Sequence, residues 1–338
     1  MICFAWSGFP QYAARCVRAL VENVQERVVV VATRPHVPIK GMDQLAGCPV
    51  AWVEHSDARK LPLIIGGIPR VLIVSGWGFP IFNRYRDEVK DNGGAVIAMV
   101  DNNFRFSIRE VLKAIRFRLF LKAKYDGYLV AGRSGTRLLE FYGVPKERIK
   151  TGLYAADETL FTGDIVLSRR EKKMLFVGQI IARKNIVAFA TAFIRANKSR
   201  GWKLEICGCG SLEDSLPKDE SIFIHDFVQP EKLAAIYQSA RIFALPSLEE
   251  HWGVVVHEAA LSGCVLLLSD RVGAADDFLG QCNGYKFNPD SMDDMVEKIG
   301  ECMRMTDAEL LEAQRESLAL SRNASKALFV NSLKELIP

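Results

Sequence analysis

The sequence predicts an α/β protein made of two Rossmann-like, doubly wound parallel-sheet domains that face a central cleft. Three observations predict this fold. The chain has 338 residues, which is more than a single hydrophobic core usually supports. Short runs rich in β-branched residues recur, and most of them are followed by a segment with helical periodicity. This alternation begins twice, once on each side of a polar, irregular stretch near residues 160–172.

The first half of the chain opens with an apolar run that we expect to be a buried strand. It lacks the basic start of a signal peptide and soon reaches glycine and proline. Further strands are expected at residues 28–33, 50–55, 71–76, 95–100 and 127–132. Runs that are apolar on both faces suit a parallel sheet covered by helices on both sides. We therefore expect residues 1–165 to form the N-terminal domain.

The second half repeats this pattern, and we assign residues 166–310 to the C-terminal domain. Its strands are expected at residues 174–179, 202–208, 221–227, 241–247 and 265–269. The end of the chain is mostly helical, and residues 311–338 are expected to pack back on the N-terminal domain as a C-terminal helix. Ligands of open α/β sheets collect outside the carboxyl ends of the strands, so the cleft between the domains is the expected site.

Composition excludes several classes of protein. With 49% hydrophobic and 25% charged residues, the chain has the composition of an ordinary globular protein. Eight cysteines without paired spacing favour a reduced, cytoplasmic compartment. The apolar stretch at residues 61–82 is interrupted by proline, arginine and glycines, which disfavours a membrane span. We expect no metal, because no zinc-ligand spacing and no Asp-x-Asp after a strand is present. We also expect no cofactor and no nucleic-acid partner.

Basic residues are in excess in residues 1–165, and part of this excess lies in the segment "SIREVLKAIRFRLFLKAKY" at 107–125. Arg116, Arg118, Lys122 and Lys124 alternate there with large apolar residues. One interpretation is a helix that packs on a sheet and exposes solvated basic residues. The other is a basic amphipathic helix that rests on an anionic membrane surface.

The segment "LEEHWGVVVHEAALSG" at residues 248–263 carries the first binding-site prediction. Glu250 lies in an expected strand-to-helix loop, and Glu258 lies in the first turns of the helix that follows. The backbone N–H groups of Gly253, Val254 and Val255 point out of the helix N-terminus, which favours an anion. Carboxylates beside an anion site suit a nucleotide sugar. The alternative is that both acids are simply solvated.

Two upstream segments add to this prediction. In "FVGQIIARKN", Arg183 and Lys184 precede a helix and can neutralise a diphosphate, although a solvated loop is the alternative. In "EICGCG", Gly208 and Gly210 follow a strand, where a flat base can approach the main chain.

Together, "FVGQ…ARKN", "ICGCG", "LPSLEEHWGVVVHEAALSG" and "NGYKFNP" resemble the retaining family 4 glycosyltransferases, which have the two-domain GT-B fold. The resemblance is strong across residues 174–290. It is looser in the first half, where "SGFPQYAARCVRAL", "VDNNFRF" and "LVAGRSGTRLLEFYGVPKERI" occur in the expected order.

The resemblance implies a role for each matched residue. Arg183 and Lys184 would hold the donor diphosphate, Glu258 the ribose hydroxyls, and Glu250 the transferred sugar. Where the family often has arginine after the glycine of "FVG", this chain has Gln179. The complete expected donor-binding set is Ser7, Gly8, Gly178, Arg183, Lys184, Gly208, Gly210, Phe227, Glu250, Trp252, Gly253, Val254, Val255 and Glu258.

For catalysis, Arg183 and Lys184 would stabilise the leaving diphosphate electrostatically, while Glu250 positions the sugar. Many family members place a histidine after the fifth strand as acceptor base, and this chain reads "MVDNN" there. Asp101 is therefore the candidate base, with Asn102 as a positioning group. The alternative is that Asp101 caps the following helix or turn.

The resemblance implies a retaining hexosyltransferase of class EC 2.4. The donor would be a UDP-sugar, with a GDP-sugar second, and the acceptor a hydroxyl of a glycan or lipid-linked molecule in surface polysaccharide synthesis. The cysteine pattern favours a cytoplasmic enzyme. The membrane interpretation of residues 107–125 would place it in peripheral contact with the inner face of the membrane. The alternatives are a nucleotide-sugar 2-epimerase or phosphorylase on the same fold, and a nucleotide-sugar-binding protein without catalysis.

Overall fold

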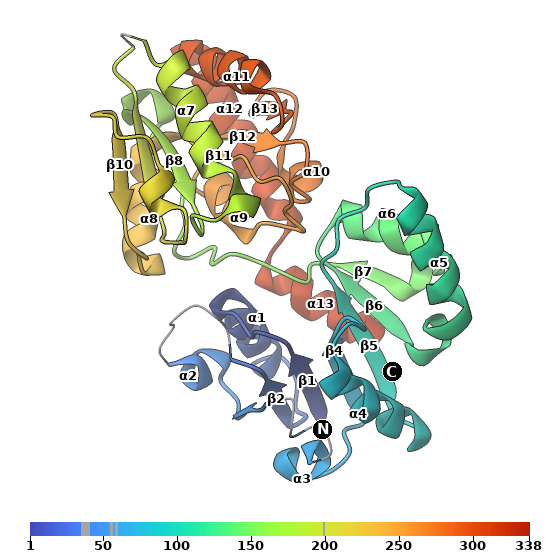
Figure 1. Ribbon diagram of the computed structural model, residues 1–338. Coiled ribbons are helices and arrows are strands. Elements are labelled where there is room, and N and C mark those ends of the chain that lie inside the picture. The colour runs from blue at the N-terminus through green and yellow to red at the C-terminus, as the bar shows by residue number, and fades with distance from the viewer. Residues whose placement is uncertain (35–40, 55–56, 58–59, 199) are drawn as a thin grey trace. The chain divides into compact units, whose positions relative to one another are not determined.

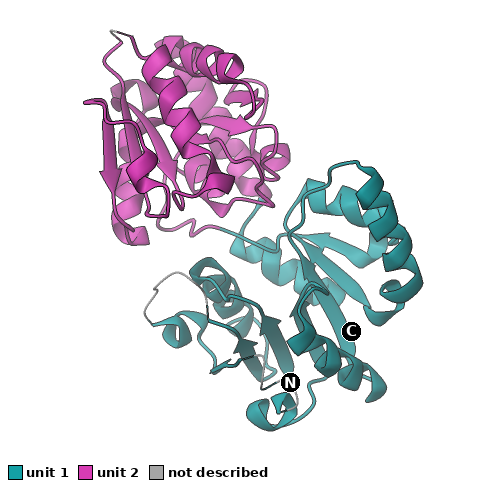
Figure 2. Ribbon diagram, in the orientation of Figure 1, with its two compact units in different colours: residues 1–155, 324–338 teal, residues 156–323 magenta. Residues whose placement is uncertain are grey.

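A computed structural model of the chain describes residues 1–34, 41–54, 57, 60–198 and 200–338. The chain forms two compact units, which Figure 2 colours separately. Unit 1 comprises Met1–Ala155 and Ala324–Pro338, and unit 2 comprises Ala156–Asn323. The main chain therefore passes between the units twice.

Unit 1 contains a parallel sheet in which β1 is central and the strand order reverses, as in Rossmann folds (Figure 1). β-branched and aliphatic side chains fill both faces of its inner strands, and they are buried. In spatial order the strands are β3 (Val50–Trp52), β2 (Val28–Ala32), β1 (Ile2–Trp6), β4 (Val71–Ser75), β5 (Ala95–Val100), β6 (Gly127–Val130) and β7 (Ile149–Thr151).

The helices of unit 1 connect these strands and cover the sheet (Figure 1). They are α1 (Gln11–Val21), α2 (Met42–Ala46), α3 (Leu61–Ile65), α4 (Pro80–Asp91), α5 (Ile108–Phe120), α6 (Arg133–Phe141) and α13 (Lys326–Leu336), with short 3-10 turns η2 (Lys122–Lys124) and η3 (Lys146–Arg148).

Helix α13 comes from the far end of the chain and completes unit 1. It packs against α1, β6 and β7. Phe329 is fully buried, and its ring stacks on that of Phe4 at 6.3 Å. Gly152 leaves room for the helix, because a Cβ at this position would lie 2.8 Å from Cγ of Leu328.

Unit 2 repeats the doubly wound pattern around β8, again with a reversal of strand order (Figure 1). In spatial order its strands are β10 (Ile222–His225), β9 (Lys203–Cys207), β8 (Glu171–Val177), β11 (Ala240–Leu245), β12 (Val265–Ser269) and β13 (Gly284–Phe287). Its helices are α7 (Ile186–Ala196), α8 (Pro230–Ser239), α9 (Val254–Leu261), α10 (Ala275–Phe278), α11 (Met292–Arg304) and α12 (Asp307–Leu320), with 3-10 turns η4 (Leu167–Arg169), η5 (Ala182–Lys184), η6 (Glu213–Ser215) and η7 (Ser321–Asn323). Both halves thus confirm the predicted fold class.

The unit boundaries differ from those expected at residues 165 and 310. Residues 156–165 and all of α12 belong to unit 2. Gln314 of α12 explains this, because its amide donates to the carbonyl oxygens of Gly163 and Ile165 and its Oε1 accepts from the N–H of Leu167. Only residues 324–338 return to unit 1.

Two short strands escaped the sequence analysis. β7 and β13 each lie at an edge of a sheet, and each includes a lysine. Charged residues are common on edge strands and interrupt the apolar run by which a strand is recognised. In the strand expected at residues 50–55, β3 ends at Trp52, and His55 lies outside the described residues.

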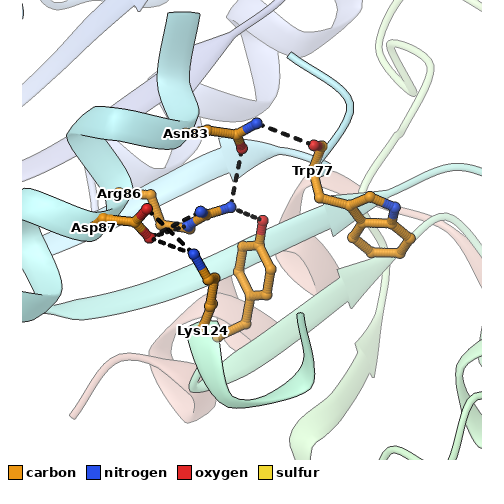
Figure 3. A network of polar contacts seen from close by, with 6 residues as sticks. Trp77, Asn83, Arg86, Asp87 and Lys124 are labelled. Atoms are coloured by element: carbon orange, nitrogen blue, oxygen red, sulfur yellow. Dashed lines mark hydrogen bonds and ion pairs between the residues drawn. The ribbon is translucent and has the colours of Figure 1, made fainter. Parts of the chain in front are cut away.

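Figure 3 shows a polar network around the buried Arg86 that joins α4 to η2. Arg86 is only 3% exposed, and its guanidinium donates to Asp87, to Oδ1 of Asn83 and to the hydroxyl of Tyr125, each at 2.8–2.9 Å. Lys124 also contacts the carboxylate of Asp87 at 3.3 Å. Because the arginine has several partners, its burial is compensated.

Helix α5 exposes an apolar stripe made of Ile108, Leu112, Ile115 and Leu119, which are spaced for one face of a helix. The four residues of the stripe are each between 49% and 81% exposed. Four basic residues on or just before α5 are also exposed: Arg105, Arg109, Lys113 and Arg116. The exposed face of α5 is therefore both apolar and basic. The first interpretation from the sequence expected only solvated basic residues on this face.

Two of the basic residues named from the sequence are engaged in contacts within unit 1. Arg118 donates to the carbonyl oxygens of Phe141 and Tyr142, and Lys124 pairs with Asp87. Among the described residues, no helix is both long and apolar enough to cross a membrane.

Candidate functional site

Two loops of unit 2 meet where the strand order reverses. β8 and β11 are hydrogen-bonded neighbours, and the chain leaves each of them at the carboxyl edge of the sheet. The loop after β8 carries η5 with Arg183 and Lys184, and the loop after β11 carries Glu250. A backbone hydrogen bond of 2.8 Å from the N–H of Leu248 to the carbonyl of Arg183 joins the two loops.

Lys184 and Glu250 form a close ion pair at this junction. Lys184 Nζ donates to Glu250 Oε2, and both side chains are only 11% exposed. The same oxygen lies 3.3 Å from the hydroxyl of Ser247 and 3.7 Å from the guanidinium of Arg183. Glu250 and Lys184 are therefore not solvated loop residues.

Arg183 is the more accessible of the two cations. Its side chain is 43% exposed, and one guanidinium N–H donates to the carbonyl oxygen of Glu249 at 2.7 Å. This hydrogen bond holds the side chain near the ion pair while leaving other donors in the guanidinium group. Gln179, at the position where the resembled family often has arginine, is exposed.

Helix α9 begins directly after the Glu250 loop. Its N-cap is Gly253, whose φ of 93° is strained for any residue with a side chain. The backbone N–H groups of Gly253, Val254 and Val255 precede the first hydrogen-bonded turn and can bind an anion. Trp252 is buried edge-on against Phe278, so this residue supports the loop from within.

Glu258 lies one turn further into α9. Its Oε2 accepts a hydrogen bond of 3.0 Å from the hydroxyl of Tyr237, a fully buried residue of α8. Burial raises the pKa of Glu258 to about 7, and the hydrogen bond from Tyr237 opposes this rise. The carboxyl group is thus held in one orientation near the start of α9.

The raised pKa of Glu258 predicts a pH-dependent stability. Between about 4.5 and 7 the folded protein retains a proton that the unfolded chain loses. The stability of the ligand-free protein relative to Glu258→Gln should therefore fall as pH rises through this window, by up to about 3 kcal/mol, and stay level above it. Urea unfolding of both proteins at pH 5, 6, 7 and 8 measures this difference. A constant difference would contradict the assignment.

The glycines of the first two loops have a packing role. A Cβ on Gly208 would lie 2.0 Å from the carbonyl oxygen of Gly178, and one on Gly210 would lie 2.3 Å from that of Ile180. The loops after β8 and β9 are therefore packed main chain against main chain. Phe227, after β10, is 39% exposed.

The expected residues of unit 1 lie in loops after β1 and β5. The N–H groups of Ser7 and Gly8 donate to the side-chain oxygens of Ser75 and Thr33, at 2.9 and 2.8 Å. Asp101 directly follows β5, and its Oδ2 accepts from the hydroxyl of Tyr154 at 3.2 Å. The N-cap of α5 is Ser107, so Asp101 does not cap the following helix.

Unit 2 thus brings together Arg183, Lys184, Glu250 and the start of α9. Sequence reasoning missed the direct pairing of Lys184 with Glu250, although both follow strands that neighbour each other in a Rossmann sheet. It also missed the contact of Tyr237 with Glu258, because a tyrosine within an ordinary amphipathic helix gives no sign of such a role. In the described part of the chain, no three His, Cys, Asp or Glu side chains are grouped to hold a metal ion.

Comparison with solved structures identifies the fold. The Anabaena protein HepE in complex with UDP superposes with a TM-score of 0.77 over 99% of this chain and 98% of that one, at 12% identity. HepE has also been solved with UDP-glucose, and that structure gives a TM-score of 0.74. At such low identity this likeness shows the fold alone, which is the GT-B fold of glycosyltransferases.

The match to a family model lies within unit 2. The family model "Glycosyl transferases group 1" matches residues 161–321. An uncharacterized glycosyltransferase of Methanocaldococcus jannaschii is 29% identical over 150 residues, which are 41% of this chain and 38% of the relative. A D-inositol 3-phosphate glycosyltransferase of Nocardia farcinica is 29% identical over 160 residues, covering 40% of this chain and 36% of that one. The match therefore spans well under half of either relative.

The chain therefore has the GT-B fold. Residues 161–321, a little under half of the chain, are similar in sequence to the group 1 glycosyltransferases.

Proposed function

We propose that the protein is a retaining glycosyltransferase that moves a sugar from a UDP-sugar to a hydroxyl group of a glycan or lipid-linked acceptor. The observation that carries the proposal is the convergence of Arg183, Lys184, Glu250 and the N-terminus of α9 in unit 2. A GDP-sugar is the second choice of donor. The complexes of HepE with UDP and UDP-glucose favour uridine over guanosine.

The proposed chemistry follows from the charges that develop as the donor bond breaks. Negative charge grows on the diphosphate, and Arg183, Lys184 and the α9 N–H groups would stabilise it. Positive charge grows on the sugar, and Glu250 would lie close enough to stabilise it and to bind hydroxyls. Glu258 would accept hydrogen bonds from the ribose. Because protein cations can neutralise the diphosphate, we propose that no metal or other cofactor is required.

We keep Asp101 as the proposed base for the acceptor hydroxyl. Asp101→Asn should lower kcat by about 10²–10⁴-fold, because general-base catalysis typically contributes that much. The affinity for UDP should stay unchanged, since Asp101 is not among the residues expected to bind the donor. Steady-state kinetics and calorimetry measure the two quantities. Asp91→Asn, at the end of α4, is the matched control, and equal losses in both variants would contradict the role.

We propose that the α5 stripe contacts an anionic membrane surface and brings the enzyme to a lipid-linked acceptor, as in surface polysaccharide synthesis. Exposed leucine and isoleucine beside arginine suit such a surface. Leu112→Ser with Leu119→Ser should weaken binding to vesicles of anionic lipid by about tenfold or more. Sedimentation with vesicles measures this. Leu63→Ser removes an equally exposed leucine from α3, and it should have no effect.

A screen of nucleotides by thermal shift tests the proposed function. Ligands that bind only the folded state raise its melting temperature, so UDP and UDP-sugars should stabilise the protein most. With the best donor, release of UDP should require an acceptor hydroxyl and should persist in EDTA. Acceptor-independent interconversion of sugars would support a 2-epimerase instead. Stabilisation without turnover, across a broad panel of acceptors, would support a binding protein.

A further inference from the structure

His257 of α9 is fully buried and uses both ring nitrogens. Its Nδ1 accepts a hydrogen bond of 3.0 Å from the N–H of Ala156, and its Nε2 lies 2.9 Å from the carbonyl oxygen of Ser321. A backbone N–H can only donate and a carbonyl can only accept. The two contacts therefore require a neutral ring with its proton on Nε2.

The two partners of His257 mark the places where the chain passes between the units. Ala156 is the first residue of unit 2, and Ser321 opens η7, which ends unit 2 at Asn323. Phe278 stacks on the imidazole at 4.9 Å with an interplanar angle of 4°. Asn323 donates to the carbonyl oxygen of Asp277, the residue before Phe278, at 2.7 Å.

Sequence order connects this ring to the proposed donor site. His257 directly precedes Glu258, and both lie in the helix whose N-terminus follows Glu250. Each of the two segments at which the chain crosses between the units, at Ala156 and at Ser321, is therefore joined to α9 by a direct hydrogen bond to His257. Neither contact is made through a flexible side chain on the segment, because both partners are main-chain atoms.

We propose that His257 is a positioning residue for sugar transfer, which fixes both crossing segments, at Ala156 and at Ser321, to the helix that binds the donor. The inference rests on the proposed function and adds a residue that contacts no substrate. Burial lowers the pKa of His257 to about 4, so the ring is neutral at physiological pH, as its two contacts require.

Removing the imidazole leaves two buried main-chain groups without partners, since Ala156 and Ser321 are only 2% and 3% exposed. His257→Leu should therefore loosen both segments. His257→Asn places an amide oxygen near the former Nδ1 and should retain the contact with Ala156. His257→Gln places an amide N–H near the former Nε2 and should retain the contact with Ser321.

Hydrogen exchange measured by mass spectrometry tests these contacts in the full-length protein. Peptides that contain residue 156 should exchange about tenfold faster in His257→Leu and His257→Gln. Peptides that contain residues 321–323 should exchange about tenfold faster in His257→Leu and His257→Asn. Phe278→Leu is the control, because it removes the stacking partner and keeps both hydrogen bonds.

Kinetics on the same variants test the role in transfer. His257→Leu should lower kcat about tenfold while the dissociation constant for UDP changes less than about twofold, because loosened segments misplace the reacting groups without removing donor contacts. His257→Asn and His257→Gln should lie between His257→Leu and wild type, and Phe278→Leu should keep the wild-type kcat per folded molecule.

Two results would overturn the inference. One is unchanged exchange at both segments in folded His257→Leu. The other is faster exchange with wild-type kcat. If the wild-type protein binds no nucleotide and transfers no sugar, the proposed function fails and the role in transfer fails with it, whereas the exchange measurements still decide whether His257 holds the crossings.

Discussion

Replacing Arg183 and Lys184 together by alanine should reduce the rate of sugar transfer by at least about 10²–10³-fold, the loss that follows removal of one preorganised electrostatic donor. The two cations are the charges that would stabilise the leaving diphosphate. Lys184 is buried, so it is fixed in position before the donor binds, and its field acts through a medium of low dielectric constant. Single-turnover kinetics with saturating donor measures this effect.

Stability must be measured alongside, because Lys184→Ala leaves Glu250 without its closest partner. Breaking a buried ion pair typically costs about 3–5 kcal/mol. Lys184→Ala combined with Glu250→Gln avoids the unpaired carboxylate. Lys172→Ala is the matched control. Lys172 is an exposed lysine at the start of β8, the strand that leads into the loop with Arg183 and Lys184. Wild-type turnover in a folded double alanine variant would disprove the assigned site.

Glu250→Gln should separate binding of the nucleotide from transfer of the sugar. The substitution keeps the shape of the side chain and removes the charge that pairs with Lys184. We expect kcat to fall about 10²-fold, because an interaction specific to the transition state is lost. UDP should bind as tightly as before or more tightly, because Lys184 is then paired only with the diphosphate.

The neighbouring residue provides the control for this experiment. Glu249 is also a loop carboxylate, but its side chain is 65% exposed, and Glu249→Gln should leave both quantities near wild type. Calorimetry with UDP and initial rates with the full donor distinguish the two effects. Equal losses of UDP affinity and kcat in Glu250→Gln would show that Glu250 contributes only to folding of the loop.

The fold was predictable because apolar strands and helical segments alternate twice, and buried parallel strands such as β4 and β12 carry almost no polar residues. The edge strands β7 and β13 were not predictable, because they are short and include charged residues. The unit boundaries also escaped prediction, since they depend on which surface α12 and α13 pack against. Helical periodicity specifies a buried face, but it does not specify the partner that covers it.

The candidate site was predictable to the extent that it depends on local sequence. Glu250, Glu258 and the start of α9 could be placed from one strand-loop-helix pattern. Contacts between distant segments could not: Tyr237 with Glu258, and His257 with Ala156 and Ser321, depend on tertiary packing. The main-chain partners of His257 are visible only in the folded unit.

The return of residues 324–338 to unit 1 has a consequence for synthesis of the protein. Phe329 and its neighbours in α13 supply part of the interior of unit 1, yet they are translated after all of unit 2. On the ribosome, residues 156–323 can fold as a continuous segment while the N-terminal unit still lacks a helix. The unit that is made first is therefore completed only after unit 2 has been made, and a chain that lacks α13 exposes the apolar surface around β6 and β7 to aggregation.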